Sequence, residues 1–91
     1  MQEMILSGES GSADHTRLLR LDPGTDSTAA GVLSHEFYEE VFIIEGDLTD
    51  LTLGERFTTG MYCCRHPRML HGPYRSDGGC LLVEFRYTAS P

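Results

Sequence analysis

The sequence predicts an all-β protein: one small domain built as an antiparallel sheet that closes into a barrel or a sandwich. Short apolar runs recur at spacings of roughly 8–12 residues, and Gly or Pro residues separate them, a pattern typical of such folds. No window of about 11 residues shows a helical period. Closure is expected because it removes the unpaired sheet edges that a small β domain must otherwise protect.

The chain length limits the protein to one domain. With 91 residues, we expect a single domain over residues 1–91, with an N-terminal strand and loop in 1–15 and the barrel core in 16–88. A chain this short buries roughly 60–70% of its extended surface, so its core is small. Phe42 and Ile44 are expected to be apolar on the outer side of the sheet, and we expect either a second copy in a homodimer or the N-terminal strand at residues 4–6 to cover them.

The N-terminal third predicts three strands separated by loops. Residues 4–6 form a short edge strand, and the Gly-, Ser- and acid-rich segment 7–14 forms a loop. Residues 16–21 interleave arginines with apolar side chains and predict a strand. That strand ends at a turn over residues 22–24, where proline precedes glycine. A further strand is expected near residues 31–33.

The central stretch carries the longest apolar run. A strand is predicted over residues 39–45, with Gly46 as the residue that stops it. Residues 48–53 predict the next strand, and a tight turn then leads into residues 56–58.

The C-terminal third predicts three more segments. Residues 61–65 form a strand that Pro67 ends, because proline cannot donate to the ladder. A short segment starts at His71, and the Asp-Gly-Gly sequence at residues 77–79 predicts a hairpin turn. Residues 80–87 form the last and clearest strand.

The charge of the chain excludes some classes of partner. The formal net charge is −7, which repels a phosphate backbone or an anionic lipid surface, so we expect neither nucleic-acid nor membrane binding. No apolar run approaches the ~20 residues of a membrane span. The first 15 residues lack the basic start and long apolar core of a secretory signal.

The three cysteines indicate reduced thiols. An odd number of cysteines without a secretory signal argues for a cytoplasmic protein. The adjacent Cys63 and Cys64 would point to opposite faces of a strand, so they cannot both bind one ion from inside. We interpret these two and Cys80 as small buried apolar residues.

A candidate metal site lies at the start of the central strand. If residues 35–38 form a corner, His35 and Glu39 both turn into one cavity, while alternation sends Glu40 to the other face. His71 begins a later segment, and placing it opposite His35 brings two imidazoles and one carboxylate together. This donor set suits Zn, Fe, Mn or Ni and leaves coordination positions open.

Other interpretations of these residues stay open. A lone histidine before a strand is more often a surface or hydrogen-bonded residue, and adjacent glutamates are often a solvated pair. Glu40 replaces Glu39 as ligand if the strand begins one residue later, because a one-residue slip exchanges the faces. His66 is expected to turn outward beside Pro67, and His15 to lie on the surface. Four further side chains either line a pocket and bind an anionic substrate or form salt bridges: Tyr62, Arg65, Tyr74 and Arg75.

The spacing of these residues resembles the two motifs of the cupin superfamily. In the first motif, G(X)5HXH(X)3–4E(X)6G, His35, Glu39 and Gly46 match the H(X)3E(X)6G part. In the second, G(X)5PXG(X)2H(X)3N, Gly60 and His71 have the right separation, and His66-Pro67 lies near the expected proline. The resemblance covers residues 18–87 and is specific for the fold rather than for a reaction.

Several positions depart from the motifs. Leu33 stands where the first histidine is expected, so a usual metal ligand is missing. Arg68 replaces a glycine and Arg75 replaces the final asparagine. The leading glycine of the first motif is displaced to Gly24 or Gly31. Three ligands remain, which is compatible with weaker metal binding or with a cupin that has lost its metal.

The resemblance implies a cupin-type antiparallel β-barrel, also described as a double-stranded β-helix or jelly roll. The sequence is most similar to the zinc-binding cupin domain of certain anti-sigma factors and more loosely to acetylacetone-cleaving dioxygenases. It implies a divalent metal ion (Zn, Fe, Mn or Ni) held by His35, Glu39 and His71. The implied function is an oxygenase, isomerase or lyase acting on a small carbonyl or carboxylate compound. The alternative is a non-catalytic ligand- or metal-sensing module acting through a protein partner, and a third hypothesis is a metal-free dimerising scaffold.

Overall fold

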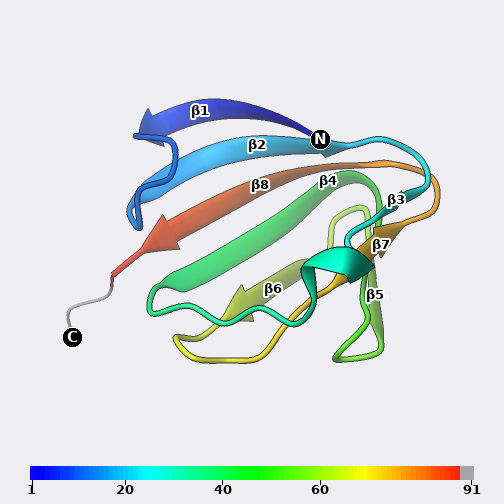
Figure 1. Cartoon of the computed structure of the whole chain (residues 1–91). Coiled ribbons are helices and arrows are strands. Elements are labelled where there is room, and N and C mark those ends of the chain that lie inside the picture. Colours follow the sequence, from blue (N-terminus) through cyan, green and yellow to red (C-terminus); the bar gives the residue numbers. More distant parts are fainter. Residues whose placement is uncertain (89–91) are drawn as a thin grey trace.

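Eight antiparallel strands form one strongly curled sheet in the computed structural model, which describes residues 1–88 (Figure 1). The strands are β1 (Gln2–Gly8), β2 (His15–Leu21), β3 (Thr25–Asp26), β4 (Tyr38–Asp50), β5 (Glu55–Thr58), β6 (Tyr62–Arg65), β7 (Tyr74–Ser76) and β8 (Cys80–Tyr87). A single turn of 3-10 helix, η1 (Thr28–Ala30), follows β3. The predicted all-β class with antiparallel pairing is therefore confirmed.

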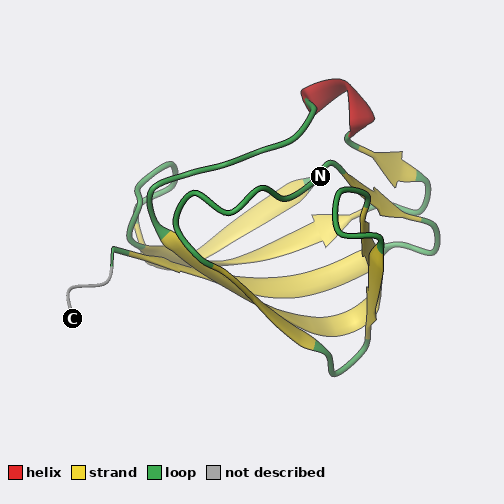
Figure 2. Cartoon of the chain, turned by 90° about the horizontal axis from the view of Figure 1, so that it is seen from below, coloured by secondary structure: helices red, strands yellow, loops and turns green. Residues whose placement is uncertain are grey.

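Strand β4 is the centre of the sheet, because it is shared by both halves. Its first half pairs with β8 on one edge and with β6 on the other. Its second half pairs with β7 on one edge and with β5 on the other. Beyond β8 the order continues to β2 and β1, and beyond β7 to β3. The curled sheet forms a trough, and the chain between η1 and β4 crosses its open side (Figure 2).

Alternation along β4 separates an inner face from an outer face, as the sequence predicts. Glu39, Val41 and Ile43 are buried, whereas Phe42 and Ile44 are exposed. The buried apolar side chains of four strands, β2, β4, β5 and β8, form the core on the inner face: Leu19, Leu21, Val41, Ile43, Leu48, Phe57, Cys80 and Leu82.

Gly46 does not stop the central strand, contrary to the prediction. Strand β4 continues through Gly46 to Asp50, with a register shift against β8 between Ile43 and Glu45. Gly46 has φ 98°, and a Cβ at this position would lie 2.1 Å from the Gly79 carbonyl oxygen. Glycine here permits a close approach of β4 to the segment that precedes β8, and it does not form a turn. The prediction of a separate strand at residues 48–53 is thus wrong. Residues 48–50 belong to β4, and a turn follows them.

Three other local predictions are also wrong. The strand expected at residues 31–33 is absent; Leu33 makes only an isolated bridge with His71, and the short strand of this region is β3. The turn at residues 77–79 is not a hairpin, because β7 and β8, which it joins, each pair with β4 and not with each other. His15 is buried at the start of β2 rather than exposed in a loop.

Among residues 1–88, we find no helix with the length and hydropathy of a membrane span.

Candidate metal centre and pocket

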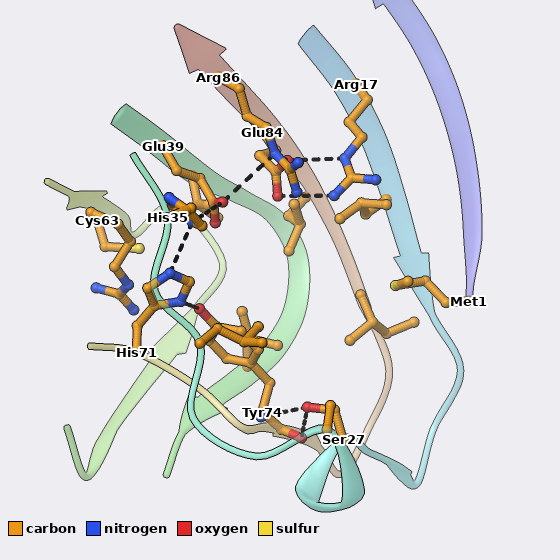
Figure 3. A pocket seen from close by; sticks show the side chains of 18 of the residues that line it. Met1, Arg17, Ser27, His35, Glu39, Cys63, His71, Tyr74, Glu84 and Arg86 are labelled. Carbon is orange, nitrogen blue, oxygen red and sulfur yellow. Dashed lines mark hydrogen bonds and ion pairs between the residues drawn. The ribbon is translucent and has the colours of Figure 1, made fainter. Parts of the chain in front are cut away.

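The inner face of the curled sheet encloses a cavity of about 310 Å³ (Figure 3). This volume lies at the small end of the range for small-molecule sites. Aliphatic side chains from β2, β4 and β8 form much of its wall: Leu19, Leu21, Val41, Leu48 and Leu82. Polar side chains also line this cavity, and they include all three predicted metal ligands.

His35, Glu39 and His71 come from three different segments and meet in this cavity. His35 lies on the loop before β4, Glu39 lies in β4, and His71 lies on the loop before β7. His35 Nε2 is 3.1 Å from Glu39 Oε2 and 2.9 Å from His71 Nε2. The structure therefore places His35 in direct contact with both other predicted ligands.

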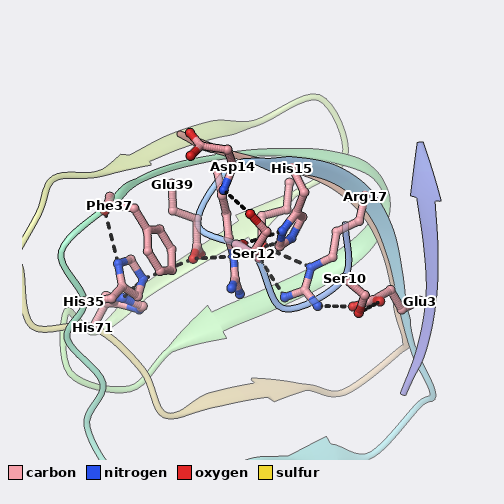
Figure 4. Close-up of polar contacts among 12 residues, drawn as sticks. Glu3, Ser10, Ser12, Asp14, His15, Arg17, His35, Phe37, Glu39 and His71 are labelled. Atoms are coloured by element: carbon pink, nitrogen blue, oxygen red, sulfur yellow. Dashed lines mark hydrogen bonds and ion pairs between the residues drawn. The ribbon is translucent and has the colours of Figure 1, made fainter. Parts of the chain in front are cut away.

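Local contacts orient the ring of His35. Its Nδ1 lies 3.1 Å from the Phe37 carbonyl oxygen, and the ring stacks on the Phe37 ring with 3.9 Å between centroids. The backbone N–H of Arg68 donates to the His35 carbonyl oxygen at 2.7 Å. A neutral His35 that donates Nδ1–H to Phe37 presents the Nε2 lone pair to Glu39 and His71, which is the tautomer required of a metal ligand (Figure 4).

His71 is likewise held through both its backbone and its ring. Its N–H donates to the Leu33 carbonyl oxygen at 3.0 Å, and its own carbonyl oxygen accepts from the Leu33 N–H at 2.8 Å. Its Nδ1 contacts the hydroxyl of Tyr74. Second contacts of this kind fix the orientation of metal-binding histidines.

The pKa values of the three groups follow from their burial. Burial lowers the pKa of His35, and burial together with His35 and Arg65 lowers the pKa of His71 to about 4. Both imidazoles are consequently neutral at pH 7 and able to act as ligands. Burial and the nearby Glu84 carboxylate raise the pKa of Glu39 to about 7.

A second polar cluster lines the same cavity and is missed by the sequence analysis. Glu84, from β8, accepts from Arg17 Nε at 2.9 Å and from Arg86 Nε at 2.5 Å. Arg86 Nε also lies 3.7 Å from Glu39 Oε2, which links this cluster to the candidate ligands. A period-2 pattern in residues 80–87 places Glu84 on the same face as Cys80 and Leu82, and this was the available signal.

The four side chains predicted to line a pocket divide into two pairs. Arg65 and Tyr74 do line the cavity. Arg65 Nη2 donates to the fully buried Asp50 at 3.0 Å. Tyr62 and Arg75 lie outside the cavity lining. The Tyr62 hydroxyl donates a hydrogen bond to Glu40, and Arg75 forms a salt bridge with Asp77.

The remaining candidates are placed as follows. Glu40 faces away from the pocket and contacts Tyr62, so Glu39 is the glutamate that points inward. His66 is exposed and packs edge-on against Tyr38, in agreement with the predicted outward orientation. Cys63 lines the cavity and is half-buried like Cys64, so only Cys80 is fully buried as expected.

The donor atoms are closer than a bound ion requires. Two ligands of one tetrahedral zinc ion are about 3.4 Å apart, whereas His35 Nε2 is 2.9 and 3.1 Å from its two partners. Among residues 1–88, no group of three His, Cys, Asp or Glu side chains is spaced as a preformed metal site. The donor types suit a divalent ion, and binding one would require each of these two distances to lengthen by a few tenths of an ångström.

Comparisons with known proteins identify the fold but not a function. No model of a protein family matches this chain. No curated protein matches it either.

Solved structures do match over nearly the whole chain. An RmlC-like cupin from Shewanella frigidimarina has a TM-score of 0.76 and 18% identity, over 96% of this chain and 75% of that one. The complex of Rhodobacter sphaeroides SigE with the anti-sigma ChrR contains a chain matched with a TM-score of 0.70 and 19% identity, over 93% and 44%. The polyketide cyclase RemF from Streptomyces resistomycificus matches with a TM-score of 0.73 and 16% identity, over 98% and 66%.

The curled antiparallel sheet and these matches define the chain as a jelly-roll protein. More specifically, it has the cupin fold, as the resemblance of its motifs implies. Because the sequence identities in the three comparisons above are below 20%, the likeness concerns the fold alone.

Proposed function

We propose that this protein is a small mononuclear metal-binding cupin in which His35, Glu39 and His71 hold one divalent ion. We further propose that it is an enzyme of the oxygenase, isomerase or lyase type acting on a small carbonyl or carboxylate compound. The observation that carries the proposal is the contact of His35 Nε2 with both Glu39 and His71 at a cavity large enough for a small molecule.

The chemistry of the donors supports an ion of borderline softness. Two neutral imidazoles and one carboxylate suit Zn, Fe, Mn or Ni, and three ligands leave positions open for a substrate or water. A bound ion of this kind would polarise a carbonyl oxygen or activate water or O₂.

Neighbouring residues orient the rings of the two histidines and raise the pKa of Glu39. Tyr74 fixes the ring of His71 through Nδ1, and Phe37 fixes the ring of His35 through stacking and its carbonyl oxygen. Glu39, whose pKa of about 7 is raised by burial and by Glu84, would lose its proton when an ion binds.

A metal- or ligand-sensing module is the alternative function. The likeness to a chain of the SigE–ChrR complex is a likeness of fold, and the fold suits both functions. Turnover separates them, because an enzyme consumes a small carbonyl compound whereas a sensing module only binds it.

Metal analysis of paired variants tests the site. The protein is purified without an affinity tag or chelator, incubated with Zn(II) or Fe(II), desalted and analysed for metal. We expect close to one ion per chain in the parent and a large loss in His71→Ala. The matched control is His66→Ala, an exposed histidine outside the cavity lining, which should retain the metal. A parent that binds no ion, or a His71→Ala variant that binds as well as the parent, contradicts the proposal.

We also propose that the protein forms a homodimer through the outer face of the sheet. Phe42, Ile44 and Phe85 are each about two-fifths exposed on β4 and β8, and Tyr62 on the neighbouring strand is more exposed. Phe42 pairs directly with Tyr62, so these apolar groups are adjacent. Light scattering of the parent and of Phe42→Ser should give a dimer and a monomer; a monomeric parent contradicts the proposal.

A further inference from the structure

Each of the three arginines that line the cavity lies against a carboxylate. Arg17 donates from Nε to Glu84 and also contacts Glu3 (Figure 4). Arg86 donates from Nε to Glu84. Arg65 donates to the buried Asp50.

The charges of this group balance without any contribution from the candidate metal ligands. The three guanidinium groups of Arg17, Arg65 and Arg86 face the three carboxylates of Glu3, Glu84 and Asp50. Within this group, no positive charge is left over to neutralise an anionic ligand. Arg65 Nε is buried and has no hydrogen-bond partner among the described residues, so a neutral acceptor that reached it would satisfy this N–H without adding a charge.

Glu84 has the central place in this balance. Only 4% of its surface is exposed, and it accepts from two arginines that come from different strands. Figure 3 shows Arg17 and Arg86 on either side of Glu84. The carboxylate of Glu84 therefore occupies the position that the carboxylate of an anionic ligand would need.

We propose that this cavity selects neutral, mainly apolar small molecules with an uncharged oxygen group over carboxylates of the same length, and that Glu84 determines this specificity. The inference rests on the proposed function only in that the ligand occupies the same cavity. A carboxylate entering the cavity loses its water and gains no unpaired cation, whereas a ketone loses much less.

The selectivity is tested with two probes of equal length, octan-2-one and octanoate, on the metal-free protein. Binding is followed by calorimetry and by the NMR shifts of the Leu19, Val41 and Leu82 methyl groups, which line the cavity. We expect octan-2-one to bind at least about tenfold more tightly than octanoate and to shift these methyl signals. Equal or tighter binding of octanoate overturns the inference, and so does binding that leaves the cavity methyl signals unchanged.

A substitution at Glu84 tests its role separately. Glu84→Gln keeps the size of the side chain but removes one of the three carboxylates, so the group gains a net positive charge and octanoate should bind at least about tenfold more tightly than it binds the parent. The matched control is Glu45→Gln, which removes an exposed carboxylate outside this cavity and should leave both affinities unchanged. A folded Glu84→Gln variant with the parent's preference contradicts the role of Glu84. If the variant does not fold, the comparison of the two probes on the parent still decides the selectivity.

The outcomes also separate this inference from the proposed metal site. Selective ketone binding by a protein that takes up no ion rejects the metal site and retains the selectivity. Metal uptake by a protein that prefers octanoate in its metal-free form supports the metal site and overturns the selectivity.

Discussion

The Nε2 atoms of His35 and His71 lie 2.9 Å apart, although the two residues are 36 positions apart in the chain. The backbone bridge between Leu33 and His71 brings their segments together two residues before His35. This bridge also places the side chain of residue 33 in the lining of the cavity.

Restoring a histidine at position 33 should strengthen metal binding. Leu33 stands where the cupin motif has its first histidine, lines the cavity and is 40% exposed, so a polar ring of similar volume fits without disturbing the core. A fourth ligand should tighten Zn(II) binding of Leu33→His by at least about tenfold, measured by competition with a coloured chelator. Leu33→Gln is the control, and an equal gain in both variants would show that the imidazole is not a ligand.

Removing the hydroxyl of Tyr74 should weaken metal binding without removing a ligand. This hydroxyl contacts Nδ1 of His71 and holds its ring. Loss of such an outer contact typically lowers metal affinity by roughly 10–100-fold, and we expect Tyr74→Phe to fall in this range. Tyr62→Phe removes a hydroxyl that contacts Glu40 outside the cavity and should bind Zn(II) like the parent. Equal affinities in the two variants would exclude a positioning role for Tyr74.

Alanine at Gly46 should destabilise the fold severely. Its φ of 98° strains any other residue, and the new Cβ would lie 2.1 Å from the carbonyl oxygen of Gly79. We expect a loss of at least about 3 kcal/mol in the free energy of unfolding by urea. Gly54 also has a positive φ, but a Cβ added there would meet no atom within 4 Å, so Gly54→Ala should lose only about 1–2 kcal/mol. Similar losses of unfolding free energy in the two variants would mean that the backbone around Gly46 shifts to accept a Cβ at little cost.

Protonation of Asp47 in acid should lower the free energy of unfolding. Burial opposes its ionisation, but the backbone N–H groups of Asp77 and Gly78 donate to its carboxylate at 3.0 and 2.8 Å and lower the pKa below the ordinary 3.8. A lowered pKa means that this contribution is complete above pH 3.8 and is lost as the pH falls through the folded-state pKa.

The variant Asp47→Asn isolates this contribution. At pH 7 it should lose about 1–2 kcal/mol of unfolding free energy, because the hydrogen bonds to a charged acceptor are weakened. The difference from the parent should shrink as urea unfolding is repeated toward about pH 2, where Asp47 is protonated in both states. A difference that is constant with pH would exclude Asp47 as the titrating group.

The sequence predicts those parts of the fold that follow from local patterns. Strand β8 has the predicted bounds, because a run rich in apolar residues follows two glycines. The inward orientation of Glu39 and the outward orientation of Glu40 follow from alternation along β4. The pairing of His35 with His71 is predictable only because both match cupin motifs, since no local rule brings residues so distant together.

The wrong predictions share a physical cause, which is the influence of distant backbone. Gly46 resembles a strand end in sequence, yet its role is set by Gly79 on another segment. The turn at residues 77–79 resembles a hairpin, but the two strands that it joins pair with β4 and not with each other. His15 follows a polar loop, but its burial depends on the neighbouring strand β8. There, Glu84 Oε1 lies 3.8 Å from His15 Nε2.

The position of β4 between four partner strands has a consequence for unfolding. Because β8, β6, β7 and β5 all bond to this one strand, neither half of the sheet is complete without it. A fragment that ends near Gly46 would leave β5 and β7 without their central partner, so the two halves cannot exist as independent folding units. The protein should therefore unfold in one cooperative transition, and hydrogen exchange in β4 should require global opening of the molecule.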